Sequence, residues 1–516
     1  MSDGINSAKG TVLLVFPDFD DPPSVFGVRA RSYGPPLGIL FLASQLEAAG
    51  YQVKVVDFSA VPYSIDLLRK LLEDIDFVGI SSLSYSQKGL RRIARDVRQI
   101  HASIPIIIGG PACTIEAKLA NEMNMELQFP EDVDLMVIGE AEPVIADILD
   151  NWPQLAKGND KHLPTDWPAM ILRDGSGDMH WLGTYREPTD LDHIERPAFH
   201  LADHESYTLF GKKAPGVLAP IITSRGCPYR CRFCNRATRH IPASDSQNAH
   251  SDHGVYQSFR LVSVSNVLEE IESLYSSGFK ILYIVDDNFT AHRDRVHRIM
   301  DGIIQRGIQM AIIISARVDR CSEELYCKMR EAGVQMVSFG LESGNQEVLD
   351  YYQKGTTVEQ AYEAVELADR VGMLTHGTFI LGAPMETERH LRKTIDFACD
   401  LPLDFALFGI LDYTYGCQLW KEAYAEGLIK SSERNVLAGS ERGLGNIPRD
   451  RLLKILKQTD YTFYLRARLW RRYIHKLRHI EPEFSRLLIR CLMRYGADFL
   501  TGKRTITKQY SGDRNY

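Results

Sequence analysis

Short apolar runs alternate with helical patterns between residue 11 and about residue 150. The segment 38–50 predicts a helix that ends at Gly50. The apolar runs with the length of buried strands are 11–16, 51–58, 76–82, 105–111 and 134–140. Strands separated by helices form parallel sheets, so the pattern predicts an α/β fold over 1–150 with a doubly wound, Rossmann-like sheet.

A second alternation of strands and helices runs from about residue 216 to residue 425. Its candidate strands are 217–224, 281–287, 310–316, 336–342, 375–382 and 405–411. Six such βα units predict a partial (β/α)6 barrel of the TIM type, whose active site lies at the carboxyl ends of the strands. Residues 151–215 predict a linker with a small hairpin, and 426–516 predict a helical C-terminal domain.

One segment of the C-terminal region, residues 460–480, has a pattern that predicts a single helix. Its apolar stripe contains Tyr461, Leu465 and Leu469, and its basic stripe contains Arg468, Arg472 and Lys476. A basic stripe is either a solvated face or a contact for an anionic substrate or partner.

Composition and charge are consistent with the predicted α/β fold. The 516 residues are 44% apolar and carry a net charge of −7, as in soluble globular proteins, so bulk attraction to nucleic acid has no support. No apolar run reaches the roughly 18 residues of a membrane span, and the N-terminus does not resemble a signal peptide. We therefore expect a reducing cytoplasm, where the nine cysteines are metal ligands or buried thiols.

Three of the cysteines form a CxxxCxxC motif just after the first predicted barrel strand. In the segment TSRGCPYRCRFCNRA they are Cys227, Cys231 and Cys234. Three thiolates can ligate three irons of a 4Fe–4S cubane and leave the fourth iron open. A structural zinc site would need a fourth ligand at a local spacing, and none is present. Buried, unreactive thiols are the other alternative, but the charged loop argues against them.

This motif, with Phe233 before its last cysteine, resembles the radical S-adenosylmethionine (SAM) superfamily. The resemblance implies that the open iron chelates SAM, and that an external low-potential electron donor reduces the cluster, which cleaves SAM to a 5′-deoxyadenosyl radical. It also implies SAM contacts at successive strand ends, from Asp287, Asn288, Arg317, Glu342 and Gly382. The ordinary alternatives are helix caps for Asp287 and Glu342 and a surface ion pair for Arg317.

The order of the modules resembles the cobalamin-binding radical SAM family over roughly residues 10–425. The segments 33–57, 79–87, 109–114 and 139–143 carry the resemblance. It implies that the corrin lies close to the sheet, against Ser82, Ser84, Gly109, Gly110, Gly139 and Glu140. No DxHxxG motif is present, so we expect no histidine ligand from it; Cys113 is either a cobalt ligand or a small buried thiol. The alternative for the whole module is a domain that has lost its cofactor.

The resemblance favours cobalamin-dependent methylation of an unactivated carbon in a small-molecule, lipid or peptide substrate. Its alternatives are a cobalamin and radical SAM cyclase or ring rearrangement without methyl transfer, and a non-catalytic redox sensor. It further implies that the C-terminal region shapes the substrate pocket. Cys417 and Tyr413, which follow the last barrel strand, are candidate hydrogen-atom donors or packing residues.

Overall fold

The computed structural model describes residues 9–19, 24–25, 28–29, 34–157, 169–183, 190–209, 212–213, 218–235, 259–476, 480, 485–486 and 489. The chain divides into two compact units. Unit 1 contains mainly residues 31–208, and unit 2 contains mainly residues 209–238 and 256–516. The predicted linker therefore belongs largely to unit 1, and the predicted C-terminal domain belongs to unit 2.

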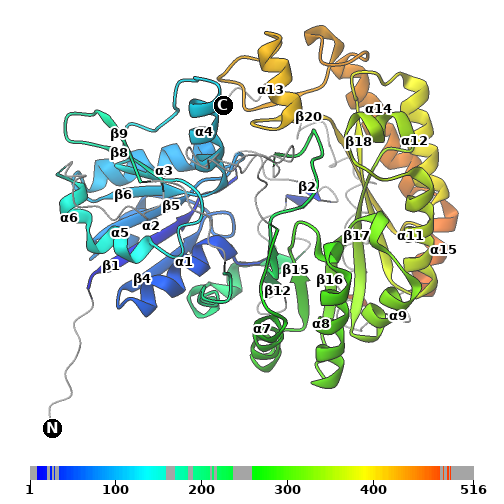
Figure 1. Cartoon of the computed structure of the whole chain (residues 1–516), viewed down its shortest axis with the longest axis horizontal. Coiled ribbons are helices and arrows are strands. Elements are labelled where there is room, and N and C mark those ends of the chain that lie inside the picture. The colour runs from blue at the N-terminus through cyan, green and yellow to red at the C-terminus, as the bar shows by residue number, and fades with distance from the viewer. Residues whose placement is uncertain are drawn as a thin grey trace, which may run out of the picture. The chain divides into compact units, whose positions relative to one another are not determined.

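Unit 1 is built on a seven-stranded sheet with the order β4-β1-β5-β6-β7-β8-β9 (Figure 1). The strands from β4 to β7 are parallel, as predicted, and helices connect these strands as they follow one another along the chain. Their bounds are β1 Thr11–Phe16, β4 Gln52–Asp57, β5 Phe77–Ser81, β6 Ile106–Gly109 and β7 Leu135–Val137. The helices are α1 Leu37–Ala48, α2 Ile65–Leu71, α3 Gln87–Ile100, α4 Pro111–Glu122, α5 Ile145–Asp150 and α6 Trp152–Leu155.

Two features of unit 1 differ from the sequence prediction. The hairpin of β8 (Met170–Arg173) and β9 (Met179–Leu182) is not part of a separate linker, because β8 pairs antiparallel with β7 and extends the sheet. Helix α4 was not predicted. Every residue from Cys113 to Leu119 is buried, so its sequence lacks the two-faced pattern that identifies a surface helix.

Unit 2 contains a six-stranded parallel sheet whose order follows the chain, β12-β15-β16-β17-β18-β19. The first and last strands do not pair with each other, which confirms a partial barrel. The strands are β12 Leu218–Ile221, β15 Ile281–Ile284, β16 Ala311–Ala316, β17 Val334–Glu342, β18 Leu374–Leu381 and β19 Phe405–Ile410.

Helices cover one face of this sheet (Figure 1). They are α7 Val264–Ser276, α8 Arg293–Gln305, α9 Glu323–Glu331, α11 Val358–Arg370 and α12 Glu388–Asp400, with the short α10 Gln346–Tyr351 after β17. The other face is partly exposed. On it, Ser338 of β17 and His376 of β18 lie side by side, and Ser338 Oγ is 2.8 Å from His376 Nδ1.

The remaining described elements are short strands and the C-terminal helices. The two-residue strands are β2 Ser24–Val25, β3 Val28–Arg29, β10 Thr208–Leu209, β11 Lys212–Lys213, β13 Ser224–Arg225 and β14 Arg260–Leu261. Strands β20 Asp412–Thr414 and β21 Asn435–Leu437 pair antiparallel on either side of α13 Gln418–Ala425. Helices α14 Arg449–Tyr464 and α15 Ala467–Lys476 replace the single helix predicted over 460–480.

The break between α14 and α15 overturns both predicted stripes. Leu465 ends α14 and is 61% exposed, whereas Leu469 of α15 is buried. In the basic set, Arg472 and Lys476 are paired with carboxylates instead of solvated.

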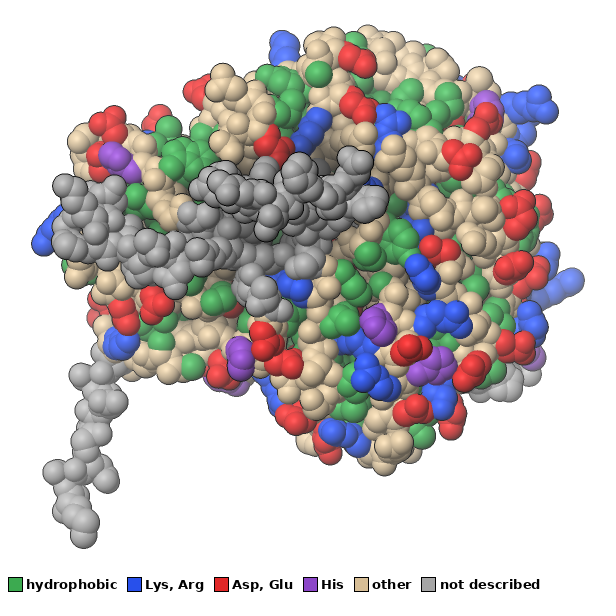
Figure 2. Space-filling model, viewed as in Figure 1, with side chains coloured by type: hydrophobic (Ala, Val, Ile, Leu, Met, Phe, Trp, Pro, Cys, Tyr) green, Lys and Arg blue, Asp and Glu red, His purple; other side chains and the backbone are tan. Residues whose placement is uncertain are grey.

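The described residues show no large region of one charge sign on the face drawn in Figure 2, in keeping with the small net charge of −7. On the face shown in Figure 2, Lys and Arg side chains are interspersed with Asp and Glu side chains. Within the described residues, none of the helices has both the length and the apolar character that a bilayer crossing requires.

Candidate functional site

The loop that carries the three cysteines is anchored by one buried carboxylate, that of Asp286. Its Oδ1 accepts hydrogen bonds from the amides of Thr223 (2.6 Å) and Ser224 (3.1 Å), and its Oδ2 accepts from both hydroxyls (2.6 Å each). Arg295 adds a bond of 2.7 Å from Nη2 to the Thr223 carbonyl. Burial raises the pKa of Asp286, while these four donors act to lower it. The start of the loop is therefore fixed just after β12.

The three cysteines lie near one another in the loop. Gly226 (φ +88°) turns the chain before Cys227, and the amide of Cys234 donates to the Cys231 carbonyl at 3.0 Å. Burial raises the pKa of Cys227, and the nearby Cys231 and Cys234 raise it further. The three sulfurs are thus close enough to interact electrostatically.

Three thiolates in one short loop suit a cubane cluster. Among the described residues, no group of three or more His, Cys, Asp or Glu side chains is placed around a single metal ion. A cubane takes one thiolate per iron, so its three sulfurs need not converge on one point.

The ends of β15 and β16 carry three of the predicted SAM contacts. Asp287 interacts electrostatically with Cys227. Asn288 is 1% exposed, and its Nδ2 has no hydrogen-bond partner among the described residues, as expected of a donor reserved for a ligand. Arg317 is buried, but its Nε and Nη2 already bond to Asp319 at 3.1 and 3.2 Å. Its guanidinium is therefore neither a surface ion pair nor wholly available to a SAM carboxylate.

Glu342, at the end of β17, lies in a buried ion pair. Its Oε1 accepts a hydrogen bond of 2.7 Å from Lys354 Nζ, and the two side chains are 7% and 8% exposed. Its φ of +64° lies in the left-handed region that glutamate rarely adopts. Lys354 was missed by the sequence reasoning because nothing near it in the chain marks its distant carboxylate partner.

The loop after β18 has a carboxylate of its own. Gly382 (φ +99°) and Ala383 donate their amides to Glu386 Oε2 at 2.6 and 2.8 Å. Glu386 is 0% exposed, and burial raises its pKa to about 7. Its Oε1 has no hydrogen-bond partner among the described residues. Glu386 therefore shapes the loop that the resemblance assigns to SAM, and it too was missed.

Cys417 and Tyr413 lie beside the cysteine loop. Cys417 is fully buried, interacts electrostatically with Cys234, and caps α13 by accepting from the Trp420 amide at 3.3 Å. The Tyr413 hydroxyl donates to the Leu444 carbonyl at 3.2 Å. Burial raises the pKa of Cys417 to about 12, so this thiol keeps its proton at neutral pH.

The small residues predicted to face the corrin gather at the carboxyl ends of β5, β6 and β7 in unit 1. The Ser82 amide donates to the Gly109 carbonyl at 2.7 Å, which joins the ends of β5 and β6. Gly110 has φ +115°, and a Cβ there would lie 2.9 Å from the Ser82 carbonyl oxygen. Gly139 has φ +89° and donates to Thr114 Oγ1 at 2.9 Å. Gly110 and Gly139 thus let the backbone turn closely at the strand ends, as a bulky planar ligand requires.

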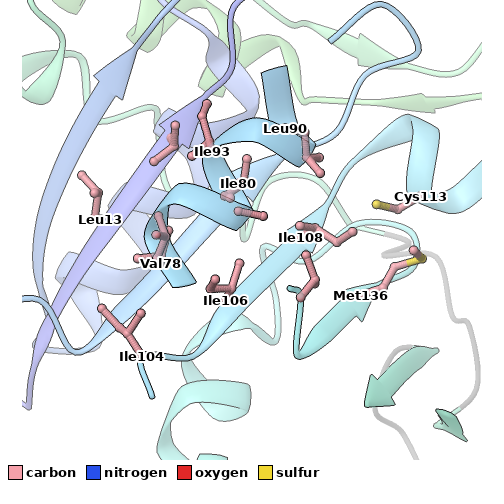
Figure 3. Packing of buried hydrophobic residues seen from close by; sticks show 14 of the residues in the cluster. Leu13, Val78, Ile80, Leu90, Ile93, Ile104, Ile106, Ile108, Cys113 and Met136 are labelled. Atoms are coloured by element: carbon pink, nitrogen blue, oxygen red, sulfur yellow. The ribbon is translucent and has the colours of Figure 1, made fainter. Parts of the chain in front are cut away.

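The remaining predicted positions divide between surface and core. Ser84, Gly109 and Glu140 are partly exposed, so all three are accessible at this edge. Cys113 is instead buried in the core beside Ile108 and Met136 (Figure 3). Burial raises its pKa to about 12. Cys113 is thus a small buried thiol in this structure, and its role as a cobalt ligand stays a prediction.

Comparisons with known proteins match both the N-terminal and the barrel domain. Residues 221–398 match the radical SAM superfamily, and residues 23–149 match the B12 binding domain. An uncharacterised methyltransferase of Pyrococcus horikoshii is 28% identical over 87% of this chain and 92% of that protein. An anaerobic magnesium-protoporphyrin IX monomethyl ester cyclase of Rubrivivax gelatinosus is 27% identical over 77% of this chain and 66% of that protein.

A solved structure has the same fold. The radical SAM methyltransferase TsrM of Kitasatospora setae, with cobalamin and a 4Fe–4S cluster bound, is 18% identical. It aligns over 82% of this chain and 76% of its own, with a TM-score of 0.59.

The fold and the two sites define an enzyme that joins a B12 binding domain to a radical SAM domain. Its cofactors are a 4Fe–4S cluster, SAM and cobalamin. The chain therefore contains a B12 binding domain and a radical SAM domain, and it is similar over most of its length to a protein named as a methyltransferase.

Proposed function

We propose that this enzyme methylates an unactivated carbon of a biosynthetic small molecule, lipid or peptide. The match to the Pyrococcus methyltransferase over 92% of its length, through both cofactor domains, carries the proposal. The match to the cyclase covers less of that protein, so the ring-forming alternative is second. When bound, cluster and SAM supply a radical that abstracts hydrogen, and cobalamin supplies the methyl group.

The residues of the chain have separate tasks in this proposal. Cys227, Cys231 and Cys234 hold the cluster, and Asp286 fixes the loop that presents them. Asp287, Asn288, Arg317, Glu342 and the loop at Gly382 bind SAM. Ser82, Ser84, Gly109, Gly110, Gly139 and Glu140 border the corrin. An external low-potential donor supplies electrons, and thiolate ligation suits the reducing cytoplasm in which we place the enzyme.

Cys417 and Tyr413 border the radical-forming side of the site. A hydrogen-atom donor would serve a ring rearrangement that ends by returning hydrogen to the product radical. Methylation leaves a methyl group where the hydrogen was, and oxidative ring closure ends with the loss of an electron, so neither needs such a donor. We therefore propose that both residues mainly position α13 and its neighbouring loop. Cys417→Ser should leave methyl transfer active; a variant that forms 5′-deoxyadenosine normally but no longer completes turnover would instead assign Cys417 a donor role.

The test follows the methyl group of SAM. Anaerobically loaded holoenzyme is reduced and supplied with SAM that carries a deuterated methyl group, and products are measured by mass spectrometry. Methylation predicts S-adenosylhomocysteine and label in the corrin fraction, together with 5′-deoxyadenosine. The cyclase predicts 5′-deoxyadenosine without label transfer, and a sensor predicts neither. The matched control, with all three loop cysteines changed to Ala, should form no 5′-deoxyadenosine.

A further inference from the structure

Lys354 occupies an unusual place for a lysine. It follows α10, it is 7% exposed, and its ammonium donates to Glu342 Oε1 at 2.7 Å. Removing an ammonium from water is costly unless nearby groups compensate. The compensation here comes from residues of the candidate cluster and SAM site.

Three further contacts place Lys354 at the junction of the strand-end loops. Its Nζ lies 5.9 Å from the ring centroid of Phe233, the residue before Cys234. Two residues before Lys354, the Tyr352 carbonyl accepts a hydrogen bond of 3.0 Å from the amide of Arg232, the residue after Cys231. The backbone carbonyl of Lys354 accepts a hydrogen bond of 2.7 Å from Arg317 Nη2.

The backbone around this ion pair is tightly packed at Gly340 and strained at Glu342. A Cβ at Gly340 would lie 2.8 Å from Lys354 Nζ and 2.6 Å from Glu342 Oε1, so the pair occupies space that only glycine leaves open. Glu342 itself has φ +64°. Strain of this kind is retained where the surroundings enforce it, commonly at functional sites.

We propose that Lys354 is a positioning residue that supplies a fixed positive charge beside the Cys231 corner of the cluster and holds the Glu342 carboxylate toward SAM. One-electron reduction by the external low-potential donor adds one negative charge to the cluster. A nearby cation in a poorly solvated site stabilises that charge, so it makes reduction easier. Charge and hydrogen bonding near the sulfurs are among the factors that set cluster potentials.

The first test is the midpoint potential of the cluster, measured by dithionite titration monitored by EPR on anaerobically loaded enzyme. Glu342→Gln is compared with the double variant Glu342→Gln, Lys354→Met, so that no buried carboxylate is left unpaired. We expect the double variant to have the more negative potential, by at least a tenfold change in the reduction equilibrium, or about 59 mV. Iron and sulfide content should be equal in the two.

The matched control is Lys328→Met, which removes the same charge from a partly exposed pair with Asp301 in unit 2. It should leave the potential unchanged. Equal potentials in the two Glu342 variants would overturn the proposal. So would a double variant that folds by circular dichroism but holds no cluster, because Lys354 would then be needed only to build the loop.

The second test is the affinity for SAM, measured by equilibrium dialysis on the loaded enzyme. Lys354→Met in the parent should weaken SAM binding about tenfold, and the same change in the Glu342→Gln background should weaken it far less, because Lys354 acts through that carboxylate. Equal losses in both backgrounds would contradict the holding role.

Discussion

The carboxylate of Asp286 holds Thr223 by two hydrogen bonds of 2.6 Å, one from the amide and one from the hydroxyl. Thr223 begins the loop that reaches Cys227 four residues later, so a carboxylate at the end of β15 fixes the start of the cluster loop at the end of β12. Sequence reasoning assigned a role to Asp287 and left Asp286 without one.

We therefore expect Asp286→Asn to hold less cluster, although Asp286 is not one of the three proposed ligands. An amide removes the negative charge and leaves only one acceptor oxygen for four donors, two amides and two hydroxyls. Each lost bond to a buried carboxylate costs about 1.5–3 kcal/mol. We expect a large fall in iron and sulfide per chain after anaerobic reconstitution, together with a lower urea midpoint. Asp301→Asn, at a partly exposed ion pair, is the control. Full cluster loading in Asp286→Asn would refute the anchoring role.

Gly110→Ala tests the proposed corrin edge. Its φ of +115° strains any other residue, and the new Cβ would press on the Ser82 carbonyl at 2.9 Å. We expect weaker cobalamin binding, measured from the visible corrin spectrum after reconstitution, and a loss of about 1–3 kcal/mol of unit 1 stability. Gly38→Ala is the matched control, because its Cβ meets nothing within 4 Å and helix α1 gains a better helix former. If Gly110→Ala bound cobalamin as tightly as the parent, Gly110 would not border the corrin.

The order of strands and helices in both units could be predicted because buried strands and amphipathic helices have different apolar periods. The cysteine loop could be predicted because its three ligands are adjacent in the chain. Lys354 and Asp286 could not be assigned, because their partners lie 12 and 63 residues away in the chain. Glu386 could not be assigned, because the sequence does not show that its carboxylate is buried. Helix α4 was missed because burial on all sides removes the pattern that marks a surface helix.

Glu386 should make stability depend on pH in a defined direction. Burial raises its pKa from 4.5 to about 7 in the folded protein. Its contribution is therefore fully present below about pH 4.5 and is lost as the pH rises through about 7, a loss of about 3 kcal/mol. Glu386→Gln stays neutral, so denaturant unfolding should show the parent losing stability relative to this variant across that window.

Glu388→Gln provides the contrast. Arg451 lowers the pKa of the exposed Glu388 through a hydrogen bond, so this pair contributes no loss of stability as the pH rises. A parent and a Glu386→Gln variant with parallel pH profiles would show that the buried carboxylate ionises as freely as one in water.

Lys476 should support the fold and not the substrate site. Its ammonium lies 2.7 Å from Asp404 Oδ2 and 2.6 Å from Asp369 Oδ1, and it donates to the Met373 carbonyl at 2.6 Å. Met373 and Asp404 directly precede β18 and β19, so α15 is tied to the amino ends of these strands. The predicted SAM loop begins at Gly382, at the other end of β18, nine residues after Met373 and so about 30 Å away.

Lys476→Met leaves the fully buried Asp404 with one cation fewer and should cost about 3–5 kcal/mol, measured by urea unfolding. Arg468→Ala, at an exposed position of the same helix, should change stability by less than about 0.5 kcal/mol. Below the unfolding transition, SAM affinity of Lys476→Met should equal that of the parent, because the ion pair stabilises the end of the barrel opposite the site. If Lys476→Met instead kept parental stability but bound SAM or substrate more weakly, α15 would be a contact for an anionic ligand.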